Sequence, residues 1–146
     1  MFTNDVDEFV PIKYWRQQDR DILVFEDYLV NIEGKIYSVK SEKYLKPFAN
    51  PNRGNYLQVG ICNDTIKKEF IYKKGYKKNF YVHKIVACTF IENIDRMLYT
   101  HVHHIDGNPQ HNHRNNLEWV TAAENSLYRF NDINKNQLYL FNNEKE

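Results

Sequence analysis

Residues 101–125 read HVHHIDGNPQHNHRNNLEWVTAAEN. Five of the six histidines in the chain lie between positions 101 and 113 of this stretch. Imidazole is the commonest protein metal ligand and a natural general base near neutral pH. The clustering therefore predicts a catalytic or metal-binding site within this short segment.

The same stretch carries clear signals of local structure. Residues 117–120 (Leu-Glu-Trp-Val) have the composition of a short strand, and residues 106–116 form a polar loop before it. Thr121 is a good helix N-cap, and Glu124 three residues later completes a capping box. We therefore expect a helix over residues 122–130, and a further strand where residues 97–102 lead into the loop.

Outward from this stretch, the rest of the chain is predicted to be mostly β-structure. Apolar residues at positions 82, 85, 86 and 90, together with Thr89, have helical spacing and predict one amphipathic helix over residues 83–91. Lysines cluster between residues 73 and 78, where we expect the tip of a basic hairpin formed by residues 70–72 and 80–82. The other expected strands are residues 22–25, 28–32, 35–39 and 56–61, with a turn at Gly34 and a loop over residues 47–55.

The net charge of +1 conceals a strong asymmetry along the chain. Residues 1–34 hold eight acids and three bases, whereas residues 35–88 hold twelve bases and three acids. The last 58 residues are again acidic, with eight acids and five bases. The central block has a net charge of +9, as expected of a surface that binds the phosphate backbone of a nucleic acid. A lysine-rich surface that contacts only solvent would have the same composition.

Composition also excludes several classes of protein. The two cysteines stand outside any CxxC pair, which argues against a thiolate zinc site. No apolar run approaches membrane-spanning length, and the acidic N-terminus is unlike a signal peptide. We expect an intracellular, soluble protein, in the cytoplasm of the host cell if it is viral, that makes no membrane contact and is a monomer or weak dimer.

The motifs resemble those of HNH endonucleases, the ββα-metal or His-Me finger group, and in particular homing-type enzymes of phages and large DNA viruses. The residues that carry the resemblance are VHKIVACTF at 82–90, HHIDGN at 103–108 and NLEWVTAAEN at 116–125. More loosely, residues 8–61 resemble the modular DNA-binding segment that precedes the nuclease in such proteins. The resemblance implies an α+β protein: a β-rich DNA-binding region over residues 1–80, an HNH module over 81–130 and a C-terminal tail over 131–146.

The resemblance also implies a role for individual residues. His104 would be the general base that activates water, and Asn116 would pin the loop and orient the His104 backbone. His103 and Asn125 would hold one divalent cation, Mg²⁺ or Mn²⁺, although a histidine ligand also suits Zn²⁺ or Ni²⁺. Adjacent residues of a strand face opposite ways, so His103 and His104 can share a site only where the strand twists or ends.

Double-stranded DNA is the expected partner. Lys73, Lys74, Lys77 and Lys78 are expected to contact phosphates, because lysine acts as a flexible point charge. Arg53, together with Asn55, is expected to read base edges. The remaining candidate DNA contacts are Arg114 and Arg129.

Several alternatives stay open at this stage. Asp106 is either a metal ligand or, as its Asp-Gly-Asn context favours, a turn former. His83 is expected to pack against its helix or cap it. The whole chain could also be a DNA-binding protein that retains a non-catalytic HNH scaffold. A structural zinc site would instead use His101, His103, His111 and His113.

Overall fold

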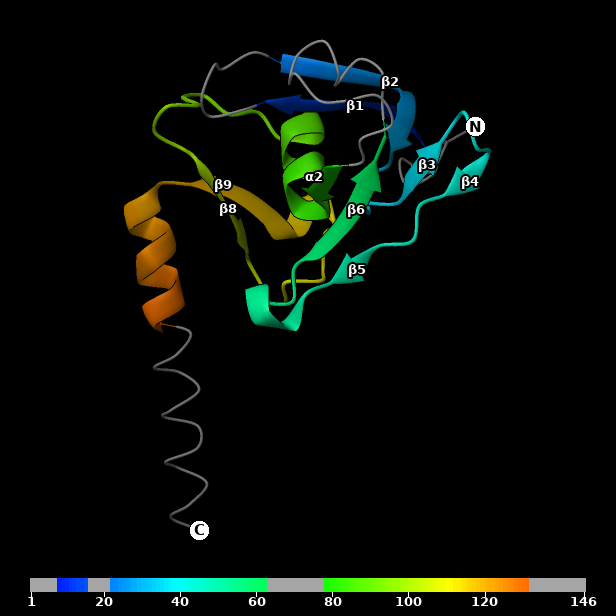
Figure 1. Cartoon of the computed structure of the whole chain (residues 1–146). Helices are drawn as coiled ribbons and strands as arrows, with labels where there is room; N and C mark the ends of the chain where they lie inside the picture. Colours follow the sequence, from blue (N-terminus) through cyan, green and yellow to red (C-terminus); the bar gives the residue numbers. More distant parts are fainter. Residues whose placement is uncertain (1–7, 16–21, 63–77, 132–146) are drawn as a thin grey trace, which may run out of the picture.

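The computed structural model describes residues 8–15, 22–62 and 78–131. Within these residues it is an α+β protein, with a β-rich N-terminal region and a ββα unit that follows it (Figure 1). No helix in the described part of the chain is long and apolar enough to cross a membrane.

Strands dominate the first half of the described chain. One antiparallel sheet has the order β1-β2-β3-β4, and a second has the order β5-β6-β7. The strands of the first sheet are β1 (Val10–Trp15), β2 (Ile22–Val30), β3 (Ile36–Ser38) and β4 (Lys43–Tyr44). Those of the second are β5 (Phe48–Ala49), β6 (Leu57–Ile61) and β7 (Lys78–Tyr81), with the 3₁₀ turn η2 (Pro51–Arg53) between β5 and β6.

The structure differs from the sequence analysis at two places in this region. Residues 22–25 and 28–32 are not two strands, because β2 runs without a break through the polar pair Glu26-Asp27. Residues 10–15, which carried no strand prediction, form β1 and pair with β2 across a bulge between Pro11 and Ile12. Proline is tolerated on an edge strand or at a bulge, so Pro11 does not prevent the pairing.

The predicted amphipathic helix is present as α2 (Val82–Phe90), which begins one residue earlier than expected and directly follows β7. The helix lies at the centre of the molecule, with β1 and β2 across one end and β6 beside it (Figure 1). Ile85 and Val86 are fully buried in it, as the spacing requires. They pack in one cluster with Phe25 of β2 and Phe80 of β7, so residues on both sides of the predicted boundary at position 80 share a core.

The ββα unit follows the helix. Strands β8 (His101–His104) and β9 (Leu117–Val120) pair antiparallel, with His104 opposite Leu117. The 3₁₀ turn η3 (Arg114–Asn116) leads into β9. Thr121 Oγ1 accepts a hydrogen bond from the Glu124 backbone N–H at 3.1 Å, so the predicted N-cap is confirmed and starts a helix over residues 122–131. The Glu124 carboxylate accepts from the Thr121 hydroxyl.

The turn at Gly34 joins the N-terminal sheet to the ββα unit. Gly34 has a φ of +85°, and a Cβ at this position would lie 3.0 Å from Val82 Cγ1 and 3.3 Å from Asn112 Cβ. Nearby, the Arg114 backbone N–H donates to the Ile32 carbonyl at 2.8 Å. Glycine is therefore required here by conformation and by space together.

We expect Gly34→Ala to lower the free energy of unfolding by more than Gly107→Ala does, because both carry backbone strain of about 1–3 kcal/mol but only the Cβ at position 34 meets close neighbours. Urea unfolding measures the loss. Gly107→Ala is the matched control, because Gly107 has a similar φ of +76° but a Cβ there would meet no atom within 4 Å. Equal losses in the two variants would argue against a tight junction at Gly34.

Candidate functional site

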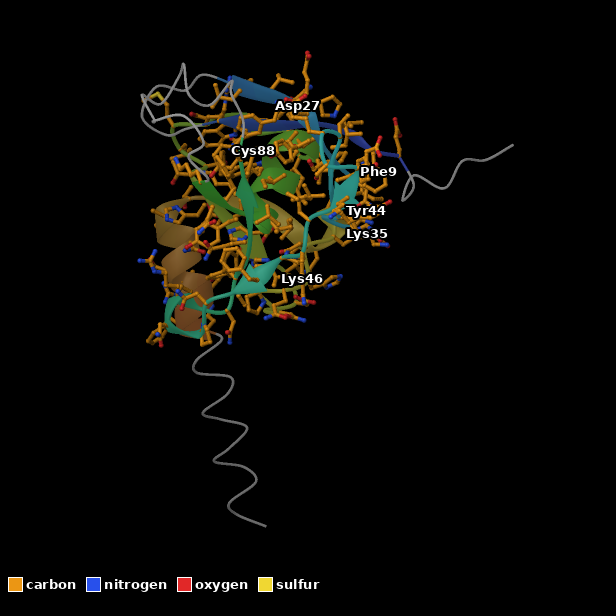
Figure 2. The ribbon with its side chains drawn as sticks, turned by 45° about the vertical axis from the view of Figure 1, so that its right-hand side comes forward. Phe9, Asp27, Lys35, Tyr44, Lys46 and Cys88 are labelled. Carbon is orange, nitrogen blue, oxygen red and sulfur yellow. The ribbon has the colours of Figure 1, made fainter. Side chains whose placement is uncertain are left out.

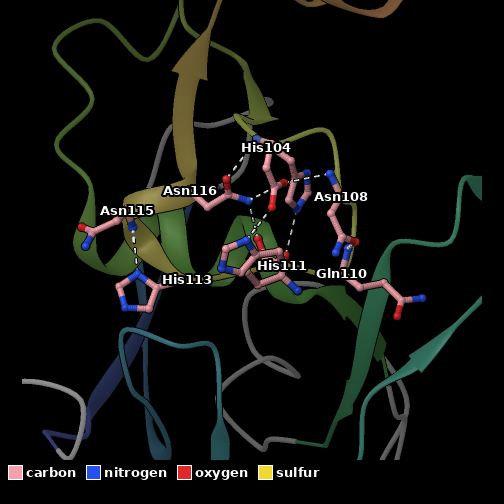
Figure 3. Close-up of polar contacts among 9 residues, drawn as sticks. His104, Asn108, Gln110, His111, His113, Asn115 and Asn116 are labelled. Atoms are coloured by element: carbon pink, nitrogen blue, oxygen red, sulfur yellow. Dashed lines mark hydrogen bonds and ion pairs between the residues drawn. The ribbon is translucent and has the colours of Figure 1, made fainter. Parts of the chain in front are cut away.

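The loop between β8 and β9 is held by a network of side-chain hydrogen bonds (Figure 3). Asn116 Nδ2 donates to Asp106 Oδ1 at 2.9 Å and to the His111 carbonyl at 2.8 Å. Asn116 Oδ1 accepts from the Asp106 backbone N–H, and the Asn116 carbonyl accepts from the Ile105 N–H. The structure thus places Asn116 where it ties together both ends of the loop that follows His104.

Asp106 shapes this loop as a turn former. Its Oδ1 accepts from the Asn108 backbone N–H at 2.8 Å, and its Oδ2 lies 2.6 Å from His111 Nδ1. The hydrogen bond from His111 is the main reason that the pKa of the Asp106 carboxyl falls to about 2. Its oxygens are engaged with the loop itself, which favours the turn interpretation over the metal-ligand one.

His104 ends β8 and is buried, with 5% of its surface exposed. Its Nε2 lies 2.9 Å from Asn112 Oδ1, and its ring stacks on Tyr56 at 5.8 Å between centroids. Burial lowers the pKa of His104 from its ordinary value, an effect that the hydrogen bond to Asn112 partly opposes. A buried imidazole with a lowered pKa is neutral at pH 7 and able to accept a proton.

His103 faces a different set of neighbours. Its Nδ1 lies 3.0 Å from Glu118 Oε1 on the paired strand, and its ring stacks on Tyr128 at 4.2 Å with an angle of 13°. A carboxylate can only accept, so Nδ1 carries the proton and Nε2 keeps its lone pair. Tyr128 comes from the helix over residues 122–131, so that helix and β9 together fix the ring.

The predicted base and metal ligands line one small cavity. His103, His104 and Asn125 surround a space of about 70 Å³, with Arg129 at its side. The strand ends at His104, which allows neighbouring histidines to reach the same cavity. Asn125 reaches it from the first turns of the helix that Thr121 caps. These four residues, which are up to 26 positions apart in the chain, thus line the same cavity.

The histidine cluster does not form a zinc site. In the part of the chain that the structure describes, no three His, Cys, Asp or Glu side chains are grouped so that they could hold a metal. His101 pairs with Thr100 Oγ1, His111 pairs with Asp106, and His113 accepts from the Asn115 N–H. These separate partners argue against the four-histidine alternative.

His83 is partly buried against neighbouring rings and does not cap its helix, whose N-cap is Tyr81. Its ring lies 5.1 Å from the ring of His104 and 5.1 Å from that of Tyr56. Burial is the main reason that the pKa of His83 falls to about 3, and the charge of a protonated His104 would lower it further. His83 is therefore a neutral neighbour of the candidate base.

Four residues that contact the predicted site were not predicted from the sequence. Tyr56 stacks on His104 and lies just before β6, 48 residues earlier in the chain. Asn112 contacts the same histidine from within the loop. Glu118 and Tyr128 contact His103. Glu118 and Asn112 lie inside the quoted stretch, but its motif spacing carries no sign of either contact.

The predicted DNA-binding residues are distributed over several faces. Arg129 lies at the small cavity, and Arg53 lines a neighbouring cavity of about 270 Å³ together with His83 and Asn125. Arg114 lines a different cavity, with Lys13 and Thr89, that contains no candidate catalytic residue. Lys78 lies in β7, with its Nζ 5.5 Å from the centre of the Phe80 ring. Lys73, Lys74 and Lys77 fall outside the described residues.

Comparisons with known proteins agree with this geometry. Residues 100–127, which span β8, the loop, β9 and the start of the last helix, match the family model described as HNH endonuclease. An uncharacterized HNH endonuclease of Acanthamoeba polyphaga mimivirus is 35% identical over 102 residues, or 70% of this chain and 27% of that relative. DNA endonuclease I-HmuI of Bacillus phage SP01 is 37% identical over 114 residues, or 75% of this chain and 58% of that protein.

A solved structure supports the relationship at the level of the fold. The structure titled "DNA binding and cleavage by the HNH homing endonuclease I-HmuI" matches with a TM-score of 0.57 and 33% identity, covering 72% of this chain and 52% of that one. This chain spans between about a fifth and three fifths of the length of the relatives it matches. It carries an HNH endonuclease module and is related to the phage HNH homing endonuclease I-HmuI and to an HNH endonuclease of a giant virus.

Proposed function

We propose that this chain is a metal-dependent DNA endonuclease that hydrolyses phosphodiester bonds, with His104 as its general base. The observation that supports this most is the small cavity that a neutral buried imidazole shares with two potential metal ligands and an arginine. A base, cation ligands and a positive side chain at one point are what hydrolysis of a phosphate diester requires.

In the proposed reaction, His104 takes a proton from a water molecule as that water attacks phosphorus. Arg129 lies where its guanidinium can hold a phosphate oxygen. Asn116, through its bonds to Asp106 and the His111 carbonyl, keeps the loop after His104 in place during the reaction. His104 and Asn116 are held in position by hydrogen bonds, as preorganised catalysis requires, whereas Arg129 is an exposed side chain.

His103 and Asn125 are the proposed ligands of one divalent cation. The hydrogen bond from His103 Nδ1 to Glu118 leaves Nε2 available, and a carboxylate behind a ligating histidine is the usual arrangement at metal sites. With one imidazole nitrogen and one amide oxygen as protein ligands, most coordination positions of the cation are left to water and phosphate oxygens, which suits Mg²⁺ or Mn²⁺. Zn²⁺ and Ni²⁺ also accept an imidazole ligand. When bound, the cation supplies Lewis-acid stabilisation of the charge on the phosphate and the departing 3′ oxygen.

Supercoiled plasmid DNA tests the proposal directly. The protein is incubated with the plasmid in Mg²⁺ or Mn²⁺, and the nicked and linear products are separated on a gel. Nicked circles indicate single-strand cleavage, and full-length linear DNA indicates a double-strand break. Binding to the plasmid without any cleavage in either cation would instead identify a DNA-binding protein on a non-catalytic HNH scaffold.

The pH dependence of cleavage provides a further prediction. Protonation of His104 removes the lone pair that accepts the proton from water, so activity falls as the pH decreases through the pKa of His104. Because burial lowers this pKa from its ordinary value of 6.5, we expect kcat/KM to be half-maximal on the acid side below pH 6.5. If kcat/KM is half-maximal on the acid side above pH 6.5, in protein that circular dichroism shows to be folded, His104 is not the general base.

The lysine-rich segment provides a prediction about DNA affinity. If Lys73, Lys74, Lys77 and Lys78 contact phosphates, each lost contact lowers the slope of log K against log salt by about 0.9 and weakens all sequences alike. Replacing all four with glutamine and measuring binding from low to moderate salt tests this. An unchanged slope would mean that the lysines form a solvated surface, and a change confined to one preferred sequence would mean that they read bases.

We assign any recognition of the DNA sequence to the loop around Arg53 and Asn55. Asn55 has a φ of +58°, and its carbonyl accepts a hydrogen bond from Gln110 Nε2 at 3.4 Å. This contact places the loop beside the segment that contains Asn112, close to the candidate active site. Arg53 itself is exposed, as a side chain that contacts the edges of bases must be.

A further inference from the structure

Asn112 is a buried polar residue directly behind the candidate base. It is 4% exposed, and its Oδ1 lies 2.9 Å from His104 Nε2. Among the described residues, the Asn112 Nδ2 group is buried and has no hydrogen-bond partner. The amide oxygen can only accept a hydrogen bond, so its contact with His104 restricts the arrangement of protons on the imidazole. The contact therefore bears on the chemistry of His104 as well as on the stability of the loop.

The acceptor in this contact determines which nitrogen of His104 is basic. A neutral imidazole has one N–H donor and one lone pair. Since the amide oxygen can only accept, Nε2 carries the proton and the lone pair is on Nδ1. Asn112 lines the large cavity of about 550 Å³ and is absent from the lining of the small cavity that holds His103, His104 and Asn125. The nitrogen that is left for the reaction is therefore Nδ1.

The large cavity opens on the N-terminal sheet, where its lining includes Phe9, Lys35 and Tyr44, gathered near the β3–β4 edge (Figure 2). Asn112 lies at its inner end, beside Val82 and Gly34. His104 therefore has different neighbours on two sides. Asn112 contacts it from the side of the N-terminal sheet, and the candidate cation ligands lie on the other side.

Asn112 is itself held firmly by the residues around it. The preceding residue, His111, is fixed by Asp106 through its ring and by Asn116 through its carbonyl (Figure 3). Two residues further on, the Arg114 N–H is bonded to the Ile32 carbonyl. These bonds anchor the backbone on both sides of Asn112, so its amide has little freedom to move away from His104.

We propose that Asn112 is a positioning residue that holds His104 as the Nε2–H tautomer and so presents the Nδ1 lone pair to the attacking water. This inference rests on the proposed role of His104 as the general base. It assigns the tautomer and the residue that selects it, neither of which follows from the spacing of the HNH motif. Outer residues that orient a histidine at a metal-assisted site are typically worth 10–100-fold in activity.

Two substitutions of similar size separate the role of the acceptor from that of packing. Asn112→Leu removes the acceptor, and we expect kcat to fall roughly 10–100-fold with KM nearly unchanged. Asn112→Asp keeps an oxygen acceptor, and it should retain most of the wild-type kcat at pH 8. Asn115→Leu, the same change at an exposed position of the same loop, is the matched control and should cleave like the wild type.

The tautomer can be observed without any catalysis. In ¹⁵N-histidine-labelled, metal-free protein, long-range ¹H–¹⁵N spectra distinguish protonated from unprotonated ring nitrogens, and His104→Asn identifies the signals. We expect Nε2–H for His104 in the wild type and in Asn112→Asp, and a mixture of tautomers in Asn112→Leu. A wild-type Nδ1–H tautomer, or the same Nε2–H spectrum in Asn112→Leu, would overturn the proposal.

These results separate the two proposals. If His104→Asn cuts DNA like the wild type, His104 is not the base, and the catalytic part of the inference fails with it. If His104→Asn is inactive but the wild-type tautomer is Nδ1–H, the endonuclease proposal stands and the assignment to Asn112 fails. If Asn112→Leu does not fold, the wild-type spectrum together with Asn112→Asp still decides the outcome.

Discussion

His104→Ala is expected to lower kcat for plasmid cleavage by about 10²–10⁴-fold, the usual contribution of general-base catalysis. The buried imidazole is the group in the small cavity whose lowered pKa leaves it neutral and able to accept a proton at pH 7. The candidate cation ligands remain in place, so affinity for DNA should change little. Single-turnover cleavage under saturating protein measures the chemical step directly.

Burial of His104 makes a control for folding necessary. Alanine at this position leaves Asn112 without its partner, so urea unfolding of the variant should accompany the kinetics. His101→Ala is the matched control, because His101 lies on the same strand and is exposed. Wild-type rates in His104→Ala, with or without a loss of stability, would rule out this histidine as the base.

Chelation of divalent cations is expected to reduce cleavage by at least 10²-fold, because Lewis-acid assistance contributes several kcal/mol and about 1.4 kcal/mol corresponds to a factor of ten. Mg²⁺ or Mn²⁺ added in excess should restore activity. DNA binding without the cation should persist, because the basic residues do not depend on it. Cleavage that continues in excess EDTA would contradict a metal-dependent mechanism.

The proposed ligands are tested by binding of Mn²⁺ in the absence of DNA, followed by electron paramagnetic resonance of the free ion. His103→Ala and Asn125→Ala should each weaken Mn²⁺ binding, and Glu118→Gln should weaken it less, because an amide still accepts the hydrogen bond from His103 Nδ1. His113→Ala, a histidine of the same loop that lies outside the small cavity, is the control. Equal affinity in the wild type and both ligand variants would place the cation elsewhere.

Local signals explain why the ββα unit could be predicted from the sequence. Thr121 and Glu124 are three residues apart, and the hydrogen bond that they predict forms within one helical turn. Helix α2 was predicted from apolar spacing, and that spacing corresponds to its buried residues. The motif residues His103, His104 and Asn125 were identified by resemblance, and the fold then brings them to one cavity.

The contacts that complete the site depend on tertiary structure, so the sequence does not specify them. Tyr56 reaches His104 only because the segment just before β6 lies beside β8 in the fold. The continuous β2 was missed because Glu26 and Asp27 resemble a break, although pairing with β1 and β3 keeps the strand intact. Strand pairing between distant segments overrides such local polarity.

The close approach at Gly34 has a consequence for how such genes can recombine. A crossover near the predicted boundary at residue 80 would replace the N-terminal region and keep the ββα unit. In this chain, however, the Ile32 carbonyl accepts a hydrogen bond from the Arg114 backbone N–H, and the turn at Gly34 closely approaches Asn112. A chimera made at residue 80 would keep the loop between β8 and β9 without these contacts, unless the incoming segment also carried a glycine turn of the same shape. Recombination that preserves activity is therefore expected to transmit residues 32–34 and 111–116 together, as a single heritable unit.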